Sequence, residues 1–103
     1  MRYEWDERKN RLNQKKHDGI SFELAALAFE DEWRLIGTDR VDEFGEQRGH
    51  LLGAVSIEPG IGVVLLVVHA CREDIEDGEI IRIISARRAE KHELRRYQEQ
   101  SLE

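Results

Sequence analysis

The fold of this chain is decided by residues 80–88, which have the sequence Ile-Ile-Arg-Ile-Ile-Ser-Ala-Arg-Arg. The first half places β-branched residues on both sides of Arg82, a pattern that favours a β-strand over an exposed helix. After Ser85 a basic run with helical character follows. We therefore expect a strand at Glu79–Ala86 and a helix at about Arg87–Glu99. An arginine within an apolar strand is costly unless it is paired or faces water, so Arg82 needs a partner or a wet cleft.

Two further segments with strand character precede this one. They are Gln47–Ile57 and the largely apolar Gly62–Arg72, with a turn at Glu58-Pro59-Gly60 between them. The acidic loop Glu73–Gly78 then leads to the last strand. Because short loops join antiparallel neighbours, these strands should form a meander with Gly62–Arg72 near its centre.

Capping residues predict two helices in the N-terminal part of the chain. Asp6 precedes a run whose only large apolar residue is Leu12, so this helix must be mostly exposed or must rest on a partner. Ser21 precedes a run with a distinct apolar face. The expected elements here are a strand at Arg2–Trp5, helices at Glu7–Lys16 and Phe22–Phe29, a short strand at Trp33–Gly37 and an acidic loop at Thr38–Gly45.

These elements predict an α+β fold in one domain, residues 1–103. Two helices precede the meander and one follows it, so we expect a small antiparallel sheet with helices on one face. The single cysteine excludes an internal disulfide and a multi-cysteine zinc site. No segment resembles a signal peptide or a membrane span, which indicates a soluble protein of a reducing compartment, the cytoplasm.

The charges are unevenly distributed along the chain. The net charge is −6, which argues against a generally nucleic-acid-binding surface. However, Glu23–Glu46 contains eight acidic residues and two arginines, whereas Glu79–Arg96 contains six basic and three acidic residues. A segregated basic face of an acidic protein can still bind phosphate. The alternative is that these segments are simply solvated faces.

Strand parity brings two arginines into one hypothesis. Period-two counting places Arg72 and Arg82 each on one face of its strand, and on neighbouring strands they would flank one patch. Two more arginines, Arg87 and Arg88, would lie at the start of the last helix and could join the edge of this patch. The same counting places Arg87 on the other face from Arg82. Guanidinium groups suit phosphate because they offer bidentate donors at fixed charge. The alternative is pairing with acidic residues, either within Glu73–Asp77 or at Glu46.

The histidines leave the proton-transfer group open. His69 and Cys71 are too few for a metal site, and a buried structural pair is the simpler interpretation. His17, His50 and His92 could each be a general acid or base, although a solvated or capping role is commoner for a lone histidine. No phosphate loop or dinucleotide motif is present, and no cofactor or metal is expected.

An ordered set of short motifs runs through nearly the whole chain, from Tyr3 to Tyr97. The motifs are Glu4-Trp5-Asp6, Lys9, Asn13, Lys16-His17, Ser21-Phe22-Glu23, Ala25-Ala26, Phe29, Asp31, Glu46, Arg48, Gly53 and Ile81-Arg82-Ile83-Ile84-Ser85-Ala86-Arg87. In this order they resemble the BrnT family of type II toxins, although each is weak alone.

The resemblance implies a fold similar to RelE-type ribonucleases and a toxin that cleaves RNA without a metal and stops translation. It also implies neutralisation by a BrnA-type antitoxin with a ribbon-helix-helix domain, in a heterotetramer that binds operator DNA only through the antitoxin. The implied catalytic residues are Arg72, Arg82, Glu46 and His17. The implied RNA-binding residues are Arg87, Arg48, Lys16, Arg88 and Tyr97.

A second function from another class stays open. The acidic middle of the chain and the thinly apolar first helix would also suit a non-catalytic interaction module, or an inactive toxin homologue that acts as a partner or co-repressor. Arg82 would then be a structural ion-pair residue.

Overall fold

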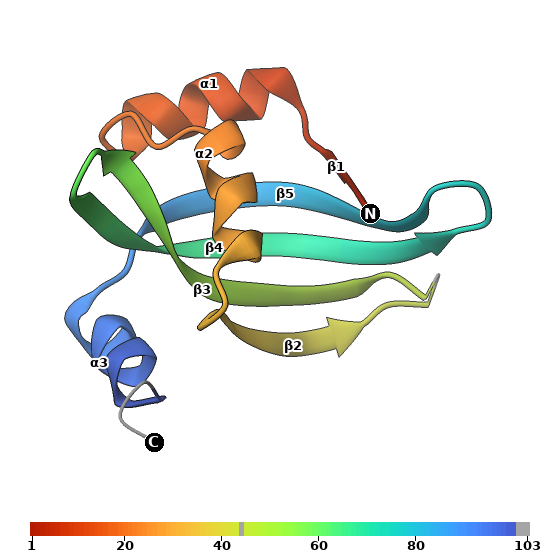
Figure 1. The fold of residues 1–103 in the computed structure, drawn as a ribbon. Helices are drawn as coiled ribbons and strands as arrows, with labels where there is room; N and C mark the ends of the chain where they lie inside the picture. Colours follow the sequence, from red (N-terminus) through yellow and green to blue (C-terminus); the bar gives the residue numbers. More distant parts are fainter. Residues whose placement is uncertain (44, 101–103) are drawn as a thin grey trace.

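A five-stranded sheet forms the centre of the structure, a computed structural model that describes residues 1–43 and 45–100 (Figure 1). The strands are β1 (Arg2–Glu4), β2 (Leu35–Val41), β3 (Gln47–Glu58), β4 (Ile61–Asp74) and β5 (Gly78–Arg88), in the spatial order β1-β5-β4-β3-β2. The helices are α1 (Glu7–Lys16), α2 (Phe22–Leu27), the short 3-10 helix η1 (Ala28–Glu30) and α3 (Lys91–Gln100). None of the helices in the described part of the chain has the length and apolar content needed to span a lipid bilayer.

The α+β class is confirmed, but the prediction of a purely antiparallel sheet is wrong. Strands β2 to β5 form the expected antiparallel meander. Strand β1 instead runs parallel to β5, with Tyr3 opposite Ile81. Parallel neighbours need a long connection, and nearly the whole chain lies between these two strands. The sheet is therefore mixed.

The main differences from the predicted element boundaries are in β2, at the turn between β4 and β5, and at the start of α3. Strand β2 continues to Val41, into the predicted acidic loop, because it stays paired with β3 there. Strands β4 and β5 also shorten the predicted loop between them, since Asp74 still pairs with Gly78. Helix α3 begins at Lys91 and not at Arg87, because β5 remains paired to β4 as far as Arg88. Phe44, part of the predicted Thr38–Gly45 loop, lies outside the described residues.

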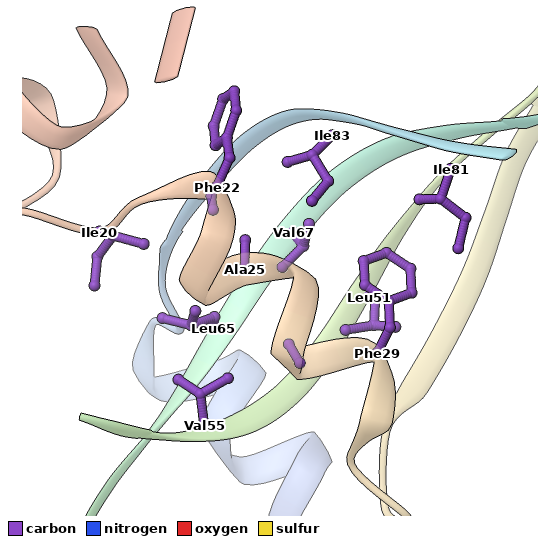
Figure 2. Close-up of a cluster of buried hydrophobic side chains, with 12 residues drawn as sticks. Ile20, Phe22, Ala25, Phe29, Leu51, Val55, Leu65, Val67, Ile81 and Ile83 are labelled. Atoms are coloured by element: carbon purple, nitrogen blue, oxygen red, sulfur yellow. The ribbon is translucent and has the colours of Figure 1, made fainter. Parts of the chain in front are cut away.

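The hydrophobic core lies between one face of the sheet and the segment formed by α2 and η1 (Figure 2). Its largest contributors are Phe22, Phe29, Leu51, Leu65, Val67, Ile81 and Ile83. Each large side chain buried in this way contributes roughly 1.5–3 kcal/mol. Gly53 of β3 permits the close approach of η1 to the sheet, because a Cβ on Gly53 would collide with the carbonyl oxygen of Ala28. On β4, Leu65 and Val67 alternate with residues that project from the opposite face.

Helix α1 is held by two buried asparagines and not by an apolar face. The Asn10 side-chain oxygen accepts a hydrogen bond from the Phe22 backbone N–H at 2.8 Å. The Asn13 amide donates to the Ala86 carbonyl at 2.8 Å and accepts from the Ala86 N–H at 3.2 Å, which caps β5 beyond the end of β1. Leu12 is exposed. The hydrogen bonds of the two asparagines therefore explain how so weakly apolar a helix stays in place.

Candidate functional site

Arginines from β2, β3, β4 and β5 project from one face of the sheet. In the cross-strand register Arg82 lies opposite Ala70, Ala70 opposite Arg48, and Arg48 opposite Arg40. Residues opposite each other on neighbouring strands share a face, and so do alternate residues of one strand, which adds Arg72. We call this the arginine face, defined by Arg40, Arg48, Arg72 and Arg82. It is opposite to the face that packs against α2.

Two of these arginines form ion pairs with glutamates from distant parts of the chain. Arg72 Nη1 lies 2.6 Å from Glu4 Oε1, and Arg82 Nη2 lies 2.7 Å from Glu46 Oε1. Both arginine side chains remain about two-fifths exposed, at 39% and 38%. We call Glu4, Glu46, Arg72 and Arg82 the four-residue cluster. Its guanidinium groups are paired, yet they are accessible to a ligand.

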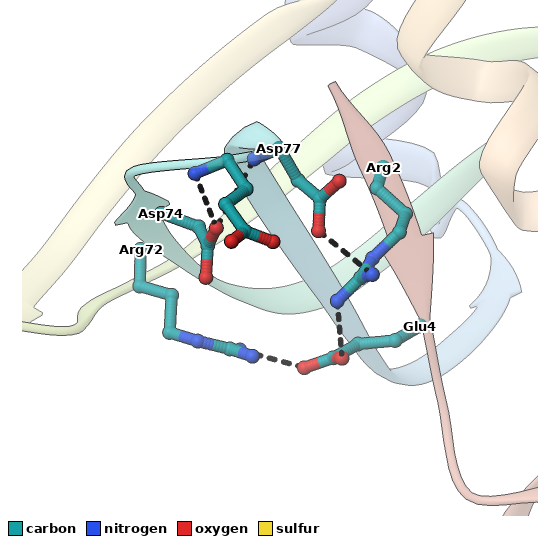
Figure 3. Close-up of polar contacts among 6 residues, drawn as sticks. Arg2, Glu4, Arg72, Asp74 and Asp77 are labelled. Carbon is teal, nitrogen blue, oxygen red and sulfur yellow. Dashed lines mark hydrogen bonds and ion pairs between the residues drawn. The ribbon is translucent and has the colours of Figure 1, made fainter.

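The first strand supplies the carboxylate that Arg72 binds, as Figure 3 shows. The hydrogen bond and the charge of Arg72 hold the pKa of Glu4 below its usual value. Arg2, on the same strand, binds Asp77 at 2.8 Å and approaches Glu4 at 3.9 Å. The acidic β4–β5 turn thus pairs with Arg2, while Arg82 takes the Glu46 partner that the sequence offered as an alternative to phosphate.

The cluster has the chemistry of an anion site. Two fixed positive charges on neighbouring strands, each with several N–H donors, match a phosphate better than any uncharged ligand. Each arginine uses one guanidinium nitrogen for its glutamate, so an anion could bind the remaining donors or replace the glutamate. Within residues 1–43 and 45–100, no three His, Cys, Asp or Glu side chains are grouped closely enough to hold a metal ion.

The sequence of this chain matches one protein-family model over residues 5–93. That family is described as the ribonuclease toxin, BrnT, of a type II toxin-antitoxin system. The chain belongs to the BrnT family. The match covers most of the chain, and it confirms the family that the ordered motifs resemble. Membership indicates a ribonuclease toxin with an antitoxin partner. A search of curated proteins found no match.

The family match includes three of the four cluster residues. Glu46, Arg72 and Arg82 lie within the matched residues. The two arginines share a face on neighbouring strands, as the parity argument proposed, and Glu46 is the ion-pair partner of Arg82. Glu4 precedes the match by one residue. Sequence reasoning missed its role, because only the parallel pairing of β1 with β5 places Glu4 opposite Arg82.

Arg48 and Arg87 also lie on the arginine face of this BrnT-family protein. Arg48 is two strands from Arg82, about 10 Å between backbones. Arg87 is opposite Leu66, which corrects the parity that separated it from Arg82. Val68 pairs with Ser85 and His69 pairs with Ile83, so Ile84 is an extra residue without a partner on β4. This bulge places Arg87 on the same face of the sheet as Arg82. Arg87 binds the nearly buried Glu93 through two hydrogen bonds of 2.7 and 3.1 Å.

The other four residues that the resemblance implied lie away from the cluster. His17 caps the C-terminus of α1 and Lys16 ends that helix. The end of α1 is attached to β5 through the hydrogen bond from Asn13 to Ala86. Ala86 is four residues, or about 13 Å, along β5 from Arg82. Arg88 lies opposite the core residue Leu65 and so projects from the other face.

Tyr97 has a structural partner. Its hydroxyl donates a hydrogen bond to Asp31, whose same carboxylate oxygen accepts the backbone N–H of Ala54 at 2.8 Å. Burial, together with this hydrogen bond, raises the pKa of Tyr97 to about 12. The hydroxyl therefore ties α3 to the end of η1 and to β3.

His69 and Cys71 lie on the face opposite the arginines. His69 is buried with its ring edge-to-face on Phe29, and burial lowers its pKa. Burial, and a hydrogen bond with Glu79, raise the pKa of Cys71 to about 11. At neutral pH the thiol is therefore protonated and a poor nucleophile.

Proposed function

We propose that this protein is an endoribonuclease toxin that binds the phosphates of RNA on its arginine face. The observation that carries the proposal is the accessible pair of guanidinium groups, Arg72 and Arg82, on neighbouring strands of one face. In RNA the 2′-hydroxyl can attack its own adjacent phosphate, and the charge that grows on the phosphate oxygens is then stabilised by preorganised donors. The family assignment supplies RNA as the substrate class.

Each cluster residue has a defined part in this proposal. Arg72 and Arg82 hold the reacting phosphate, and Arg48 holds the backbone beside it. Glu46 keeps Arg82 extended across the sheet until phosphate takes its place. Arg87, Arg88, Lys16 and Tyr97 have weaker support as RNA contacts, since Arg87 and Tyr97 are occupied by Glu93 and Asp31.

We further propose that cleavage needs no metal, because the nucleophile belongs to the RNA and the positive charge to the arginines. Cleavage of mRNA in the cytoplasm stops translation. The sheet and its flanking helices suit a RelE-like fold. A ribbon-helix-helix antitoxin neutralises the toxin in a heterotetramer by covering the arginine face, and this complex contacts operator DNA through the antitoxin.

One observation favours the non-catalytic alternative. Both cluster arginines already have carboxylate partners within the chain, as a purely structural ion-pair network would. In that case the protein would bind its partner without cutting RNA.

The test compares wild-type protein with Arg82→Ala in a cell-free translation extract that contains a reporter mRNA, so that free and ribosome-bound RNA are both present. Losing one such donor should slow cleavage roughly 10²–10³-fold, and a chelator should leave wild-type cleavage intact. Arg11→Ala is the matched control, because Arg11 is exposed on α1 and has no ion pair among the described residues. Undiminished cleavage by folded Arg82→Ala would sink the proposal.

A further inference from the structure

A bulge in β2 turns two consecutive side chains toward the arginine face. Thr38 pairs with Gly49 and Arg40 pairs with Arg48, which leaves Asp39 without a partner in the ladder. Bulges of this kind redirect side chains and are frequent beside active sites. Here Asp39 Oδ1 lies 3.1 Å from Nδ1 of His50, a residue that shares the arginine face with Arg48.

The His50 ring is held in one orientation and is partly exposed. It lies over Gly37 of β2, where an added Cβ would come within 3.0 Å of its Nε2 atom. The Asp39 carboxylate engages Nδ1 of the ring. About a third of the side chain, 34%, is exposed. An imidazole with Nδ1 held by a carboxylate and with a partly exposed ring is arranged for proton transfer.

The charges that surround His50 favour an anion. Arg48 is two residues away on β3, and Arg40 faces Arg48 directly from β2. Like charges opposite each other are unfavourable, and among the described residues neither arginine has an acidic partner within ion-pair distance. From β4, the residue opposite His50 is the uncharged Val68. Asp39 is therefore the acidic group that His50 contacts, and Arg40 and Arg48 are its cationic neighbours.

The ion pair of Arg82 reaches the strand that carries this group. Arg82 lies on β5, yet it binds Glu46, which directly precedes β3, so the two side chains together span β4. Ala70, the residue between Arg82 and Arg48 in the register, is almost fully covered. A phosphate held between Arg82 and Arg48, the two residues on either side of Ala70 in the register, would lie close to His50, which follows Arg48 on the same face two residues or about 7 Å along β3. The hydrogen bond between His50 and the 2′-hydroxyl would form only when RNA binds, since catalytic hydrogen bonds are often not yet formed in an unliganded enzyme.

We propose that His50, positioned by Asp39, is the proton-transfer group of RNA cleavage; this rests on the proposed ribonuclease function. His50 Nε2 takes the proton of the 2′-hydroxyl while the 2′-oxygen forms a bond to the adjacent phosphorus. The bond from phosphorus to the 5′-oxygen breaks, and that oxygen takes a proton from solvent water. The products are a 2′,3′-cyclic phosphate and a 5′-hydroxyl end, and the imidazolium returns its proton to water. Asp39 is a positioning residue.

The experiment measures cleavage of the reporter mRNA in the translation extract for His50→Gln, with His92→Gln on α3 as the matched control. Loss of the base should slow cleavage roughly 10²–10⁴-fold. Binding of an RNA oligonucleotide with 2′-O-methyl groups should stay at the wild-type affinity, because the arginines are intact. Added imidazole should restore part of the rate to His50→Ala, as a merely structural role would not allow.

Asp39→Asn gives an independent readout that survives if a His50 variant fails to fold. Without the Asp39 carboxylate the His50 ring loses the contact that positions it, so cleavage should slow while the affinity for the 2′-O-methyl oligonucleotide stays at the wild-type value. Wild-type cleavage rates from folded His50→Gln, or from folded Asp39→Asn, would overturn the proposal. If Arg82→Ala also cleaves normally, or wild type does not cleave, the proposed ribonuclease function itself fails.

Discussion

At the scale of single residues, the arginine face is defined by which charges are already satisfied. Arg72 and Arg82 have glutamate partners, while Arg40 and Arg48 face each other without one among the described residues. Partly exposed ion pairs contribute little to stability, so their main effect is to hold the guanidinium groups in place. The unpaired arginines and the oriented His50 are the groups free to meet a ligand first.

The Arg72–Glu4 pair should make stability depend on pH. The pKa of Glu4 is lowered in the folded protein, mainly by the hydrogen bond from Arg72. A lowered pKa means that the stabilisation is complete above the ordinary glutamate value, about 4.3, and is lost as the pH falls through the lowered value. The difference in thermal midpoint between wild type and Glu4→Gln should therefore shrink as the pH falls through this range. Glu32→Gln, at an exposed position, is the control, and a difference that stays constant down to acid pH contradicts the assignment.

Some residues of the site were within reach of the sequence and others were not. Alternation alone placed Arg72 and Arg82 on one face, and their β-branched neighbours made the strands clear. Glu4 and Asp39 escaped prediction because each acts through a strand pairing with no local pattern, parallel pairing for one and a bulge for the other. His50 was one of three histidines that could transfer a proton, and the resemblance favoured His17; the contact with Asp39 distinguishes His50 only in the structure.

At the scale of elements, capping and turn residues predicted more than strand parity did. Asp6 and Ser21 cap α1 and α2 as expected, and the meander follows from its short connections. Parity counting failed for Arg87, because the extra residue Ile84 in β5 exchanges the two faces. This bulge contains no glycine that would have marked it in the sequence, so the face of Arg87 could not be predicted.

Helix α1 should be unusually sensitive to one polar residue. Asn13 bonds both backbone groups of Ala86 and the carbonyl of Ile20. Asn13→Ala leaves these buried groups unpaired, which should cost about 1–3 kcal/mol. For a domain of this size each kcal/mol lowers the thermal midpoint by roughly 4–8 °C. Lys15→Ala, on the exposed side of α1, is the comparison; equal midpoints for the two variants would show that the asparagine does not hold the helix.

At the scale of the whole molecule, the two faces of the sheet have separate tasks. One face buries the core beneath α2 and η1, and the other carries arginines from four strands. The chain has a net charge of −6, so its positive charge is concentrated rather than general. This arrangement would let an acidic protein bind RNA at one place, as we propose, and an antitoxin that covers this face would prevent it.

The measurement that tests the central claim most directly is the mapping of RNA ends in cells after induction of the wild-type protein or Arg82→Ala, each with and without an antitoxin encoded beside it. Our account predicts growth arrest with new 5′-hydroxyl RNA ends for wild type alone, and neither effect for folded Arg82→Ala or in the presence of the antitoxin. Growth arrest without new RNA ends, or the same ends from Arg82→Ala, would contradict the claim that the arginine face cleaves RNA.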